Sequence, residues 1–302
     1  MQSIHKTVLL NETIEGLDLN NKSIVLDATF GGGGHSLEIC NRYPGIKIIA
    51  LDQDASAFTK AKKKFKNVKC EISFANDNFR NLDKVLGEKK VDGIIFDLGL
   101  SSDQLENSGR GFSFTKNEPL SMQMQMQSKE NKNSKGEELT AEEIVNTWEE
   151  KNLADIIYGY GEEKFARRIA KGIVEARAKK KIETTFDLVK IIEDSVPAFY
   201  KRGRLHFATR TFQALRIAVN DELGALEEGL AKGFSSLSAG GRMSVISFHS
   251  LEDRIVKRFF KQKERDGLAK LINKKPITPQ KEEIINNNRS RSAKLRSLEK
   301  IK

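Results

Sequence analysis

The sequence has few residues that can form disulfides or bind metal ions. Among its 302 residues only two are cysteines, Cys40 and Cys70, and they form no CxxC pair and have no histidine cluster nearby. This usage indicates neither a zinc site nor a disulfide framework, so we expect no metal. It is typical of a reducing cytoplasm, where we expect the protein to act.

Long apolar runs are also missing. No stretch approaches the roughly eighteen apolar residues that a membrane-spanning helix needs. The N-terminal MQSIHKTVLLNE has no extended apolar segment of the kind found in signal peptides. We therefore expect no membrane partner.

Acidic residues are fewer than basic ones. The chain has 52 lysines and arginines against 42 acidic residues, a net charge of +10. A basic balance favours an anionic partner, with nucleic acid first among the candidates. A solvated basic surface is the alternative that charge alone leaves open. Monomer and dimer are equally compatible with the sequence.

Apolar stretches of strand length alternate with helical patterns over the first hundred residues. We expect strands at 22–30, 46–54, 68–75 and 91–99. Helices are expected between them, at 35–42, 54–66 and 79–88. Continuous apolar strands separated by helices predict a parallel sheet covered on both faces, which is a doubly wound, Rossmann-like α/β domain.

The pattern then becomes purely helical and later returns to strands. We interpret residues 1–110 and 213–302 as one discontinuous core and 111–212 as an inserted all-helical domain that binds RNA. Within the core's second part, a long amphipathic helix is predicted from Phe212 to Leu230. Near the C-terminus, EEIINNNRSR is predicted to be a mobile link between two short strands, KKPITP and SAKLRSLEK.

The stretch DATFGGGGHS, residues 27–36, closes the first predicted strand with four glycines. A glycine-rich turn into a helix lets a ligand approach the backbone and offers it free N–H groups. The third glycine of the dinucleotide fingerprint falls on Ser36, which argues against a pyrophosphate ligand. Asp27, Gly31 and Gly33 fit the methyltransferase version of this turn, although a plain turn also explains the run.

The later strands end in groups that can bind a ligand. Asp52 follows the second strand, where an acid accepts hydrogen bonds from ribose hydroxyls, or it caps the next helix as Asp54 also can. Phe79 is either a wall for adenine or a core aromatic. Asp97 closes the fourth strand. Because open α/β sheets bind ligands at the carboxyl ends of their strands, these positions predict one site.

Longer motifs resemble a known family. HKTVLLNE, DATFGGGGHS, DGIIFDLGLSSDQLE, RGFSF, YGEEKFARRIAKGIVEAR, ATRTFQALRIAVNDEL and GGRMSVISFHSLEDRIVKRFF are similar to the RsmH (MraW) family of bacterial 16S rRNA (cytosine-N4) methyltransferases. The resemblance implies a class I methyltransferase that uses S-adenosyl-L-methionine. It implies methylation of the N4 amino group of a decoding-centre cytidine in the small ribosomal subunit.

The resemblance also assigns residues to roles. Cofactor contacts fall on Gly33, Gly34, His35, Asp52, Phe79, Asp97 and Gln104. Asp97 is also the candidate catalytic acceptor of an N4 proton, with a purely cofactor-binding role as the alternative. His249, in SFHSLED, lies near the site by pattern, or it makes a hydrogen bond at a helix entry beside a Ser250 cap.

The candidates for contacts to RNA phosphates are basic. They are Arg110, Arg167, Arg168 and Lys171. A solvated face is the alternative for the three on the predicted helix.

One segment departs from the family pattern. After RGFSF the family carries three charged residues, where this chain has the neutral Ser121, Gln123 and Gln125 between methionines. This puts in doubt any salt bridge or RNA contact that those charges make. A small-molecule methyltransferase, a dehydrogenase and a non-enzymatic RNA-binding protein are the competing functions.

Overall fold

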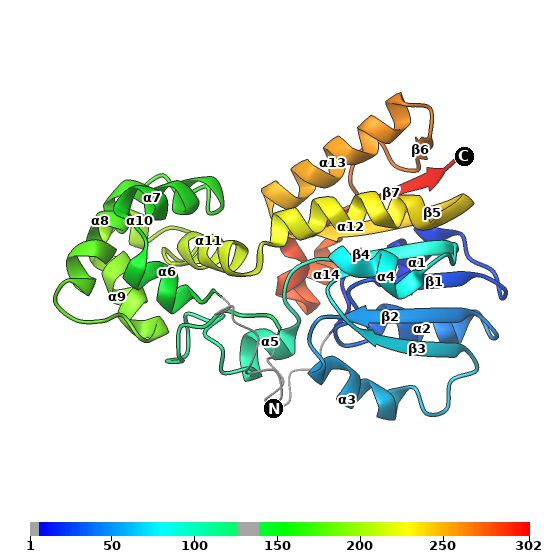
Figure 1. Ribbon diagram of the computed structural model, residues 1–302, viewed down its shortest axis with the longest axis horizontal. Coiled ribbons are helices and arrows are strands. Elements are labelled where there is room, and N and C mark those ends of the chain that lie inside the picture. Colours follow the sequence, from blue (N-terminus) through cyan, green and yellow to red (C-terminus); the bar gives the residue numbers. More distant parts are fainter. Residues whose placement is uncertain (1–5, 126–138) are drawn as a thin grey trace. The chain divides into compact units, whose positions relative to one another are not determined.

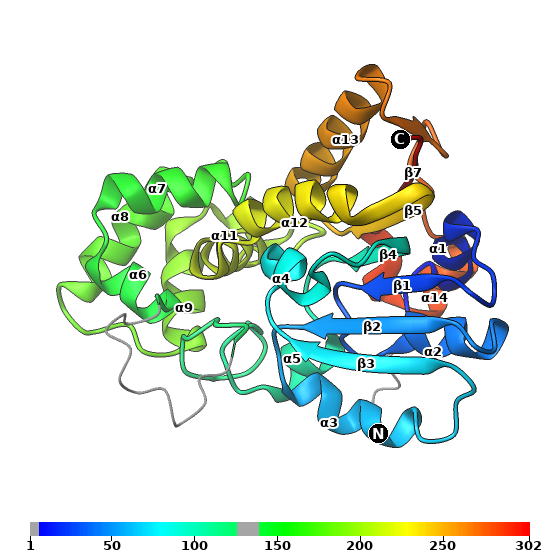
Figure 2. The ribbon, with the colours of Figure 1, turned by 45° about the vertical axis from the view of Figure 1, so that its right-hand side comes forward.

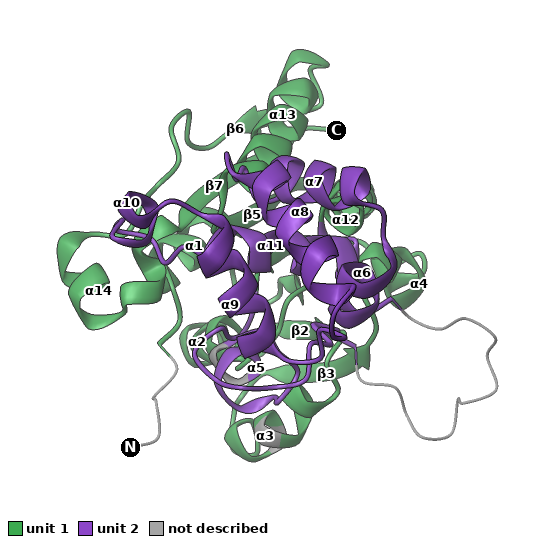
Figure 3. Cartoon of the chain, turned by 90° about the vertical axis from the view of Figure 1, so that its left-hand side faces the viewer, with its two compact units in different colours: residues 1–99, 223–302 green, residues 100–222 purple. Residues whose placement is uncertain are grey.

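The computed structural model describes residues 6–125 and 139–302, shown in Figure 1. The chain divides into two compact units (Figure 3). Unit 1 contains residues 1–99 and 223–302, and unit 2 contains residues 100–222. Unit 2 thus extends beyond the 111–212 insertion of the sequence analysis at both ends.

Unit 1 is built on a seven-stranded sheet (Figure 2). Its strands are β1 (Ile24–Asp27), β2 (Lys47–Asp52), β3 (Glu71–Asn76), β4 (Val91–Asp97), β5 (Leu237–Ser247), β6 (Ala269–Leu271) and β7 (Lys294–Lys300). They lie in the order β3-β2-β1-β4-β5-β7-β6. The first five in this order pair in parallel, and β7 pairs antiparallel with both β5 and β6. The predicted parallel sheet is confirmed.

Helices cover both faces of this sheet. On one face α1 (Leu10–Leu17), α2 (Gly34–Arg42) and α3 (Ser56–Lys64) share a core with Ile48, Ala50 and Ile95. On the other face α4 (Leu82–Leu86), α12 (Glu222–Ser236) and α13 (Ser250–Arg265) share a core with Leu26, Ile94 and Phe96. Neighbouring residues of β4 thus point to opposite cores, which explains why the strands are apolar throughout.

The C-terminal region differs from the prediction. EEIINNNRSR forms α14 (Lys281–Asn286) and the 3-10 helix η3 (Asn288–Ser292), so the prediction of a mobile link is wrong. Helix α14 is held by a residue near the other end of the chain. The N–H of Leu9 donates to Glu283 Oε1 at 2.9 Å. SAKLRSLEK supplies β7 as expected, whereas KKPITP makes only an isolated bridge between Ile277 and Leu295.

Unit 2 is helical. It contains α5 (Ser102–Asn107), α6 (Ala141–Thr147), α7 (Glu150–Gly159), α8 (Ala166–Arg177), α9 (Thr185–Ser195), α10 (Ala198–Lys201) and α11 (Thr209–Asn220). Its own core includes Leu153, Ile169 and Leu215, all fully buried. The side chain of Thr140 accepts the N–H of Glu143 at 3.0 Å and caps α6.

The long helix predicted from Phe212 to Leu230 is interrupted. α11 ends at Asn220, Asp221 adopts a left-handed conformation with φ 45°, and α12 begins at Glu222. A left-handed residue cannot continue a right-handed helix. Two hydrogen bonds from Arg216 to the Glu222 carboxylate, at 2.7 and 2.9 Å, support the break.

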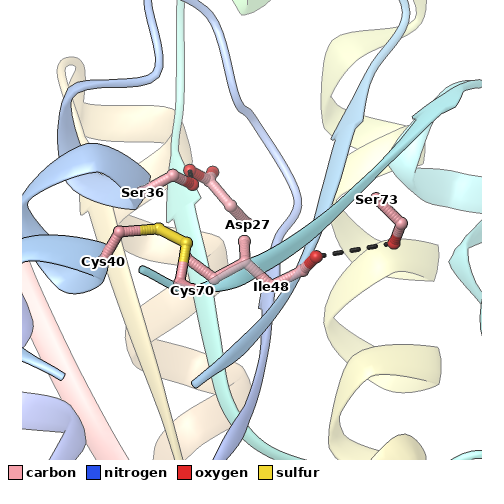
Figure 4. Close-up of a disulfide and its surroundings, with 6 residues drawn as sticks. All are labelled: Asp27, Ser36, Cys40, Ile48, Cys70 and Ser73. Atoms are coloured by element: carbon pink, nitrogen blue, oxygen red, sulfur yellow. Dashed lines mark hydrogen bonds between the residues drawn. A yellow bond between two sulfur atoms is a disulfide. The ribbon is translucent and has the colours of Figure 1, made fainter. Parts of the chain in front are cut away.

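A disulfide joins Cys40 and Cys70, so the expectation of no disulfide is wrong (Figure 4). Cys40 lies buried near the end of α2, and Cys70 directly precedes β3. The two Cα atoms are 5.1 Å apart although the residues are separated by 30 positions. Only the packing of α2 beside the sheet brings them together, and no local pattern signals it.

Among the helices of the described residues, none combines the length and apolarity needed to cross a bilayer.

Candidate active site at the ends of the parallel strands

The glycine loop after β1 has a conformation that only glycine suits. Gly31 and Gly33 have φ values of 51° and 71°. A Cβ atom on Gly33 would lie 2.6 Å from Phe30 Cζ, and one on Gly34 would collide with the hydroxyl of Thr7. The loop therefore packs tightly against Phe30 and Thr7. Helix α2 starts at Gly34, so its first N–H groups lie close to the end of β1.

Asp52 holds this loop in place. Its Oδ2 accepts the N–H of Gly31 at 2.7 Å, and its Oδ1 accepts the N–H of Asp54 at 2.8 Å. The carboxylate thus ties the end of β2 to the glycine loop. Asp54 in turn accepts hydrogen bonds from the backbone and the hydroxyl of Ser56, at 3.1 and 2.7 Å, where α3 begins.

Asp27 is a buried acid at the end of β1. Its Oδ2 accepts the Ser36 hydroxyl at 2.6 Å, and both side chains are drawn in Figure 4. Burial raises the pKa of Asp27 to about 6, against the opposing effect of the Ser36 hydrogen bond. Ser36 stands where the dinucleotide fingerprint has its third glycine, and that local pattern does not predict its hydrogen bond to Asp27.

Asp97 ends β4 beside the glycine-loop helix. Its N–H donates to Thr29 Oγ1 at 2.5 Å, and its Oδ2 lies 3.7 Å from Nδ1 of the buried His35. Its Oδ1 is buried and has no hydrogen-bond partner within the described part of the chain. Burial first, then the carboxylates of Asp27 and Glu252, raise the pKa of Asp97 to about 8. This carboxyl is therefore suited to a cation or a hydrogen-bond donor.

Glu252 reaches the same region from α13. Its Oε2 accepts the N–H groups of Phe248 and His249, at 2.8 and 3.2 Å, while His249 Nδ1 accepts the N–H of Glu252 at 3.4 Å. His249, rather than the predicted Ser250, is thus the helix cap. Glu252 was not predicted as a site residue, although its spacing of three from His249 is that of a capping box.

Two predicted cofactor residues have other contacts in the structure. The Phe79 ring lies edge-on to Phe96, with centroids 5.5 Å apart, and is half-buried against the core. Gln104 belongs to unit 2, where its side chain accepts the N–H of Ser101 at 2.9 Å in a capping box on α5. Contacts of these residues to a cofactor stay predictions.

The predicted RNA contacts divide into two groups, all in unit 2. Arg110 Nη1 donates to the main-chain carbonyl oxygens of Gln123 and Met124, at 3.1 and 2.7 Å. Its guanidinium therefore holds a segment of its own chain. Arg167 and Arg168 are exposed on α8. Lys171 is also exposed and lies 3.7 Å from Glu175.

The neutral segment is ordered by its apolar residues and not by charge. Met122 and Met124 are 1% and 5% exposed and belong to the core of unit 2. The N–H of Met124 donates to Asn220 Oδ1 at 2.8 Å. Packing of this segment therefore does not depend on charged side chains at positions 121, 123 and 125.

The sheet order, with antiparallel β7 between β5 and β6, and the glycine loop followed by acids at the ends of β2 and β4 define the core of a class I methyltransferase. Sequence comparison makes the assignment specific. Residues 2–301 match the model of the MraW methylase family, and the chain belongs to that family.

Individual relatives are similar over the full length. A protein named ribosomal RNA small subunit methyltransferase H, from Clostridium botulinum (strain Kyoto / Type A2), is 45% identical over 321 aligned positions that cover all of both chains. An rRNA methylase from Streptococcus thermophilus has a TM-score of 0.45 at 13% identity and covers 99% of this chain and 100% of its own. A Streptococcus mutans protein solved in complex with SAH has a TM-score of 0.47 at 12% identity, with the same coverage.

Proposed function

We propose that the chain transfers a methyl group from S-adenosylmethionine to the N4 amino group of a decoding-centre cytidine in 16S rRNA of the small ribosomal subunit. Membership of the MraW methylase family and the 45% identical relative named for the small subunit support this function. Its net charge of +10 suits a polyanionic substrate. Action on ribosomal subunits places it in the cytoplasm.

The site residues fit a cationic nucleoside cofactor. The observation that carries the proposal is the buried Oδ1 of Asp97, which lacks a partner in the described chain and lies among further acids. S-adenosylmethionine supplies an activated methyl group on a positively charged sulfur. Gly33, Gly34 and His35 would hold it at the start of α2, and Asp52 would bind its ribose.

Asp97 is the candidate for a second task. The lone pair of the cytosine N4 is delocalised into the ring, so the amino group is a poor nucleophile. An acceptor for one of its protons draws the nitrogen toward a tetrahedral geometry. When N4 takes the methyl group, the sulfur–methyl bond would break and S-adenosylhomocysteine would leave. The carboxylate of Asp97 would accept the N4 proton, which leaves a neutral methylamino group and a protonated carboxyl.

The test is transfer of a tritiated methyl group to assembled small subunits, with free cytidine as the control substrate. We expect label in the subunit RNA and none in cytidine. Label in cytidine alone would make the chain a small-molecule methyltransferase. The Asp97→Asn variant should bind the cofactor more weakly in calorimetry, and at saturating cofactor it should lose turnover by about 100-fold or more. Loss of binding alone would restrict Asp97 to a cofactor contact.

A further inference from the structure

A cluster of aromatic and basic side chains lies in unit 2, which is purple in Figure 3. It forms where Phe165, just before α8, contacts two rings of α10. We call it the aromatic–basic patch. Its members are Lys164, Phe165, Arg167, Arg168, Phe199 and Tyr200. The catalytic proposal uses none of the aromatic members.

The aromatic side of the patch is exposed, yet its rings are held in place by packing and hydrogen bonds. Phe199 is 67% exposed, which is unusual for so large an apolar side chain. Phe165 stands edge-on to Phe199 and to Tyr200, with centroids 6.4 and 4.9 Å apart. Beneath them the fully buried carboxylate of Glu163 accepts the Tyr200 hydroxyl at 2.5 Å and the Phe165 N–H at 2.8 Å. The rings around Phe199 are therefore held in fixed positions.

The basic side of the patch is not neutralised. Lys164 Nζ lies 5.1, 5.8 and 5.3 Å from the ring centroids of Phe165, Phe199 and Tyr200. Arg168 lies 5.9 Å from the Phe165 centroid. Within the described chain, neither of these cations nor Arg167 has a carboxylate at salt-bridge distance.

Other lysines of unit 2 do have acidic partners. Lys171 lies 3.7 Å from Glu175, and Lys190 lies 3.0 Å from Asp194. Positive charge without an acidic partner in the described chain therefore lies beside the exposed ring of Phe199. This combination suits an anionic partner that also has a flat apolar face.

We propose that the aromatic–basic patch binds a single-stranded segment of RNA, with a base stacked on Phe199 and phosphates against Arg167 and Arg168. The inference rests on the proposed RNA substrate. Stacking on an aromatic ring beside cations is how proteins bind single strands without reading sequence. A duplex does not fit this role, because its base faces are stacked within the helix.

The test measures binding of short fluorescent single-stranded oligouridine and oligoadenosine to the full chain by anisotropy. Phe199→Ala should weaken binding of both by about tenfold, and Phe199→Tyr should retain most of it because the ring remains. The Arg167→Gln/Arg168→Gln variant should weaken binding and lower the slope against the logarithm of salt concentration by about 1.4, since each single-strand phosphate contact contributes about 0.7.

Matched controls come from the same unit. Phe186→Ala removes another exposed aromatic residue, which is 47% exposed, and Lys181→Gln/Lys190→Gln removes two lysines that already have acidic partners, Glu142 and Asp194. Both controls should bind the oligonucleotides within about twofold of the parent chain, because single surface substitutions away from a binding site have small effects. Circular dichroism spectra establish that all variants are folded.

Three outcomes would overturn the inference. In the first, the parent chain binds no oligonucleotide. In the second, the patch variants bind as the parent does. In the third, they bind oligonucleotides normally but lose assembled small subunits, which would make the patch a protein-docking surface. Failure of methyl transfer alongside Phe199-dependent RNA binding would sink the proposed function and leave this inference standing.

Discussion

The hydroxyl of Ser36, in the first turn of α2, donates a 2.6 Å hydrogen bond to the buried carboxylate of Asp27 at the end of β1. This bond joins the glycine-loop helix to the strand that precedes it. Removing it leaves an acceptor buried without its donor, which costs about 1–3 kcal/mol.

Ser36→Ala should therefore lower the free energy of unfolding by about that amount near pH 8. The loss should be smaller near pH 5, because the pKa of Asp27 is about 6 and the carboxyl is then protonated. Urea unfolding at both pH values measures the difference. Ser235→Ala, which removes an exposed hydroxyl bonded to its own helix, is the control. An equal loss at both pH values would contradict the assignment.

Asp97 should make stability fall as pH rises. Its pKa is 3.8 in the absence of the fold and about 8 in the folded protein. Between these values the folded state holds a proton that the unfolded chain has lost, so stability declines from about pH 4 to about pH 8. Asp97→Asn should exceed the parent in free energy of unfolding by roughly 2–5 kcal/mol near pH 9 and match it near pH 4.

Thermal unfolding across this pH range checks the Asp97 prediction. Asp155→Asn, on the exposed side of α7, is the matched control and should follow the parent curve. A parallel pH profile for Asp97→Asn and the parent would show that Asp97 is ionised in the folded protein throughout.

Cofactor binding should release a proton. At pH 7 Asp97 is mostly protonated, and a positive charge placed beside it lowers its pKa. Calorimetry in buffers with different ionisation enthalpies should detect release of close to one proton with S-adenosylmethionine. S-adenosylhomocysteine, whose sulfur is uncharged, should release much less. Equal release by both compounds, or by the Asp97→Asn variant, would exclude Asp97 as the source.

Gly34→Ala should destabilise the chain through a single steric conflict. The added Cβ meets the hydroxyl of Thr7, and overpacking of this kind costs about 1–3 kcal/mol. Thr7→Ala removes that hydroxyl, so the double variant should recover a large part of the loss. A double-mutant cycle on urea unfolding and on cofactor affinity measures the coupling. Strictly additive effects would place the conflict elsewhere.

The Cys40–Cys70 bridge should contribute measurably to stability. Closing a loop of 30 residues is worth about 3–4 kcal/mol in the chain-entropy model. Reductant should lower the unfolding temperature of the parent and leave a Cys40→Ser/Cys70→Ser variant unchanged. Alkylation before lysis, followed by mass spectrometry, reports whether the bridge exists in the cell. Complete alkylation of both thiols would show that the cellular form is reduced.

Local patterns predicted the features of the site that depend on neighbours in sequence. Apolar runs indicated the parallel strands because β1 and β4 are buried on both faces. The run of glycines indicated the loop because a side chain at Gly33 or Gly34 would collide with its neighbours. The acids at the ends of β2 and β4 followed from the general location of ligands on such sheets.

Features that depend on distant segments could not be predicted in this way. The contact of Leu9 with Glu283 and the pairing of Cys40 with Cys70 require the folded sheet. Glu252 influences Asp97 only because α13 follows β5, the strand that pairs with β4. Each of these is a tertiary effect that leaves no periodic signal in the chain.

The pairing of β4 with β5 has a consequence for synthesis of the protein. These neighbours are parallel in the sheet, yet all of unit 2 lies between them in the chain. A nascent polypeptide therefore exposes the β5-facing edge of β4 until translation has passed residue 247. Folding of the intervening helices before that point lowers the loop-closure entropy of the later β4–β5 pairing. The carboxylate of Glu252 emerges later still, so the charge environment of Asp97 is completed only when the last quarter of the chain leaves the ribosome.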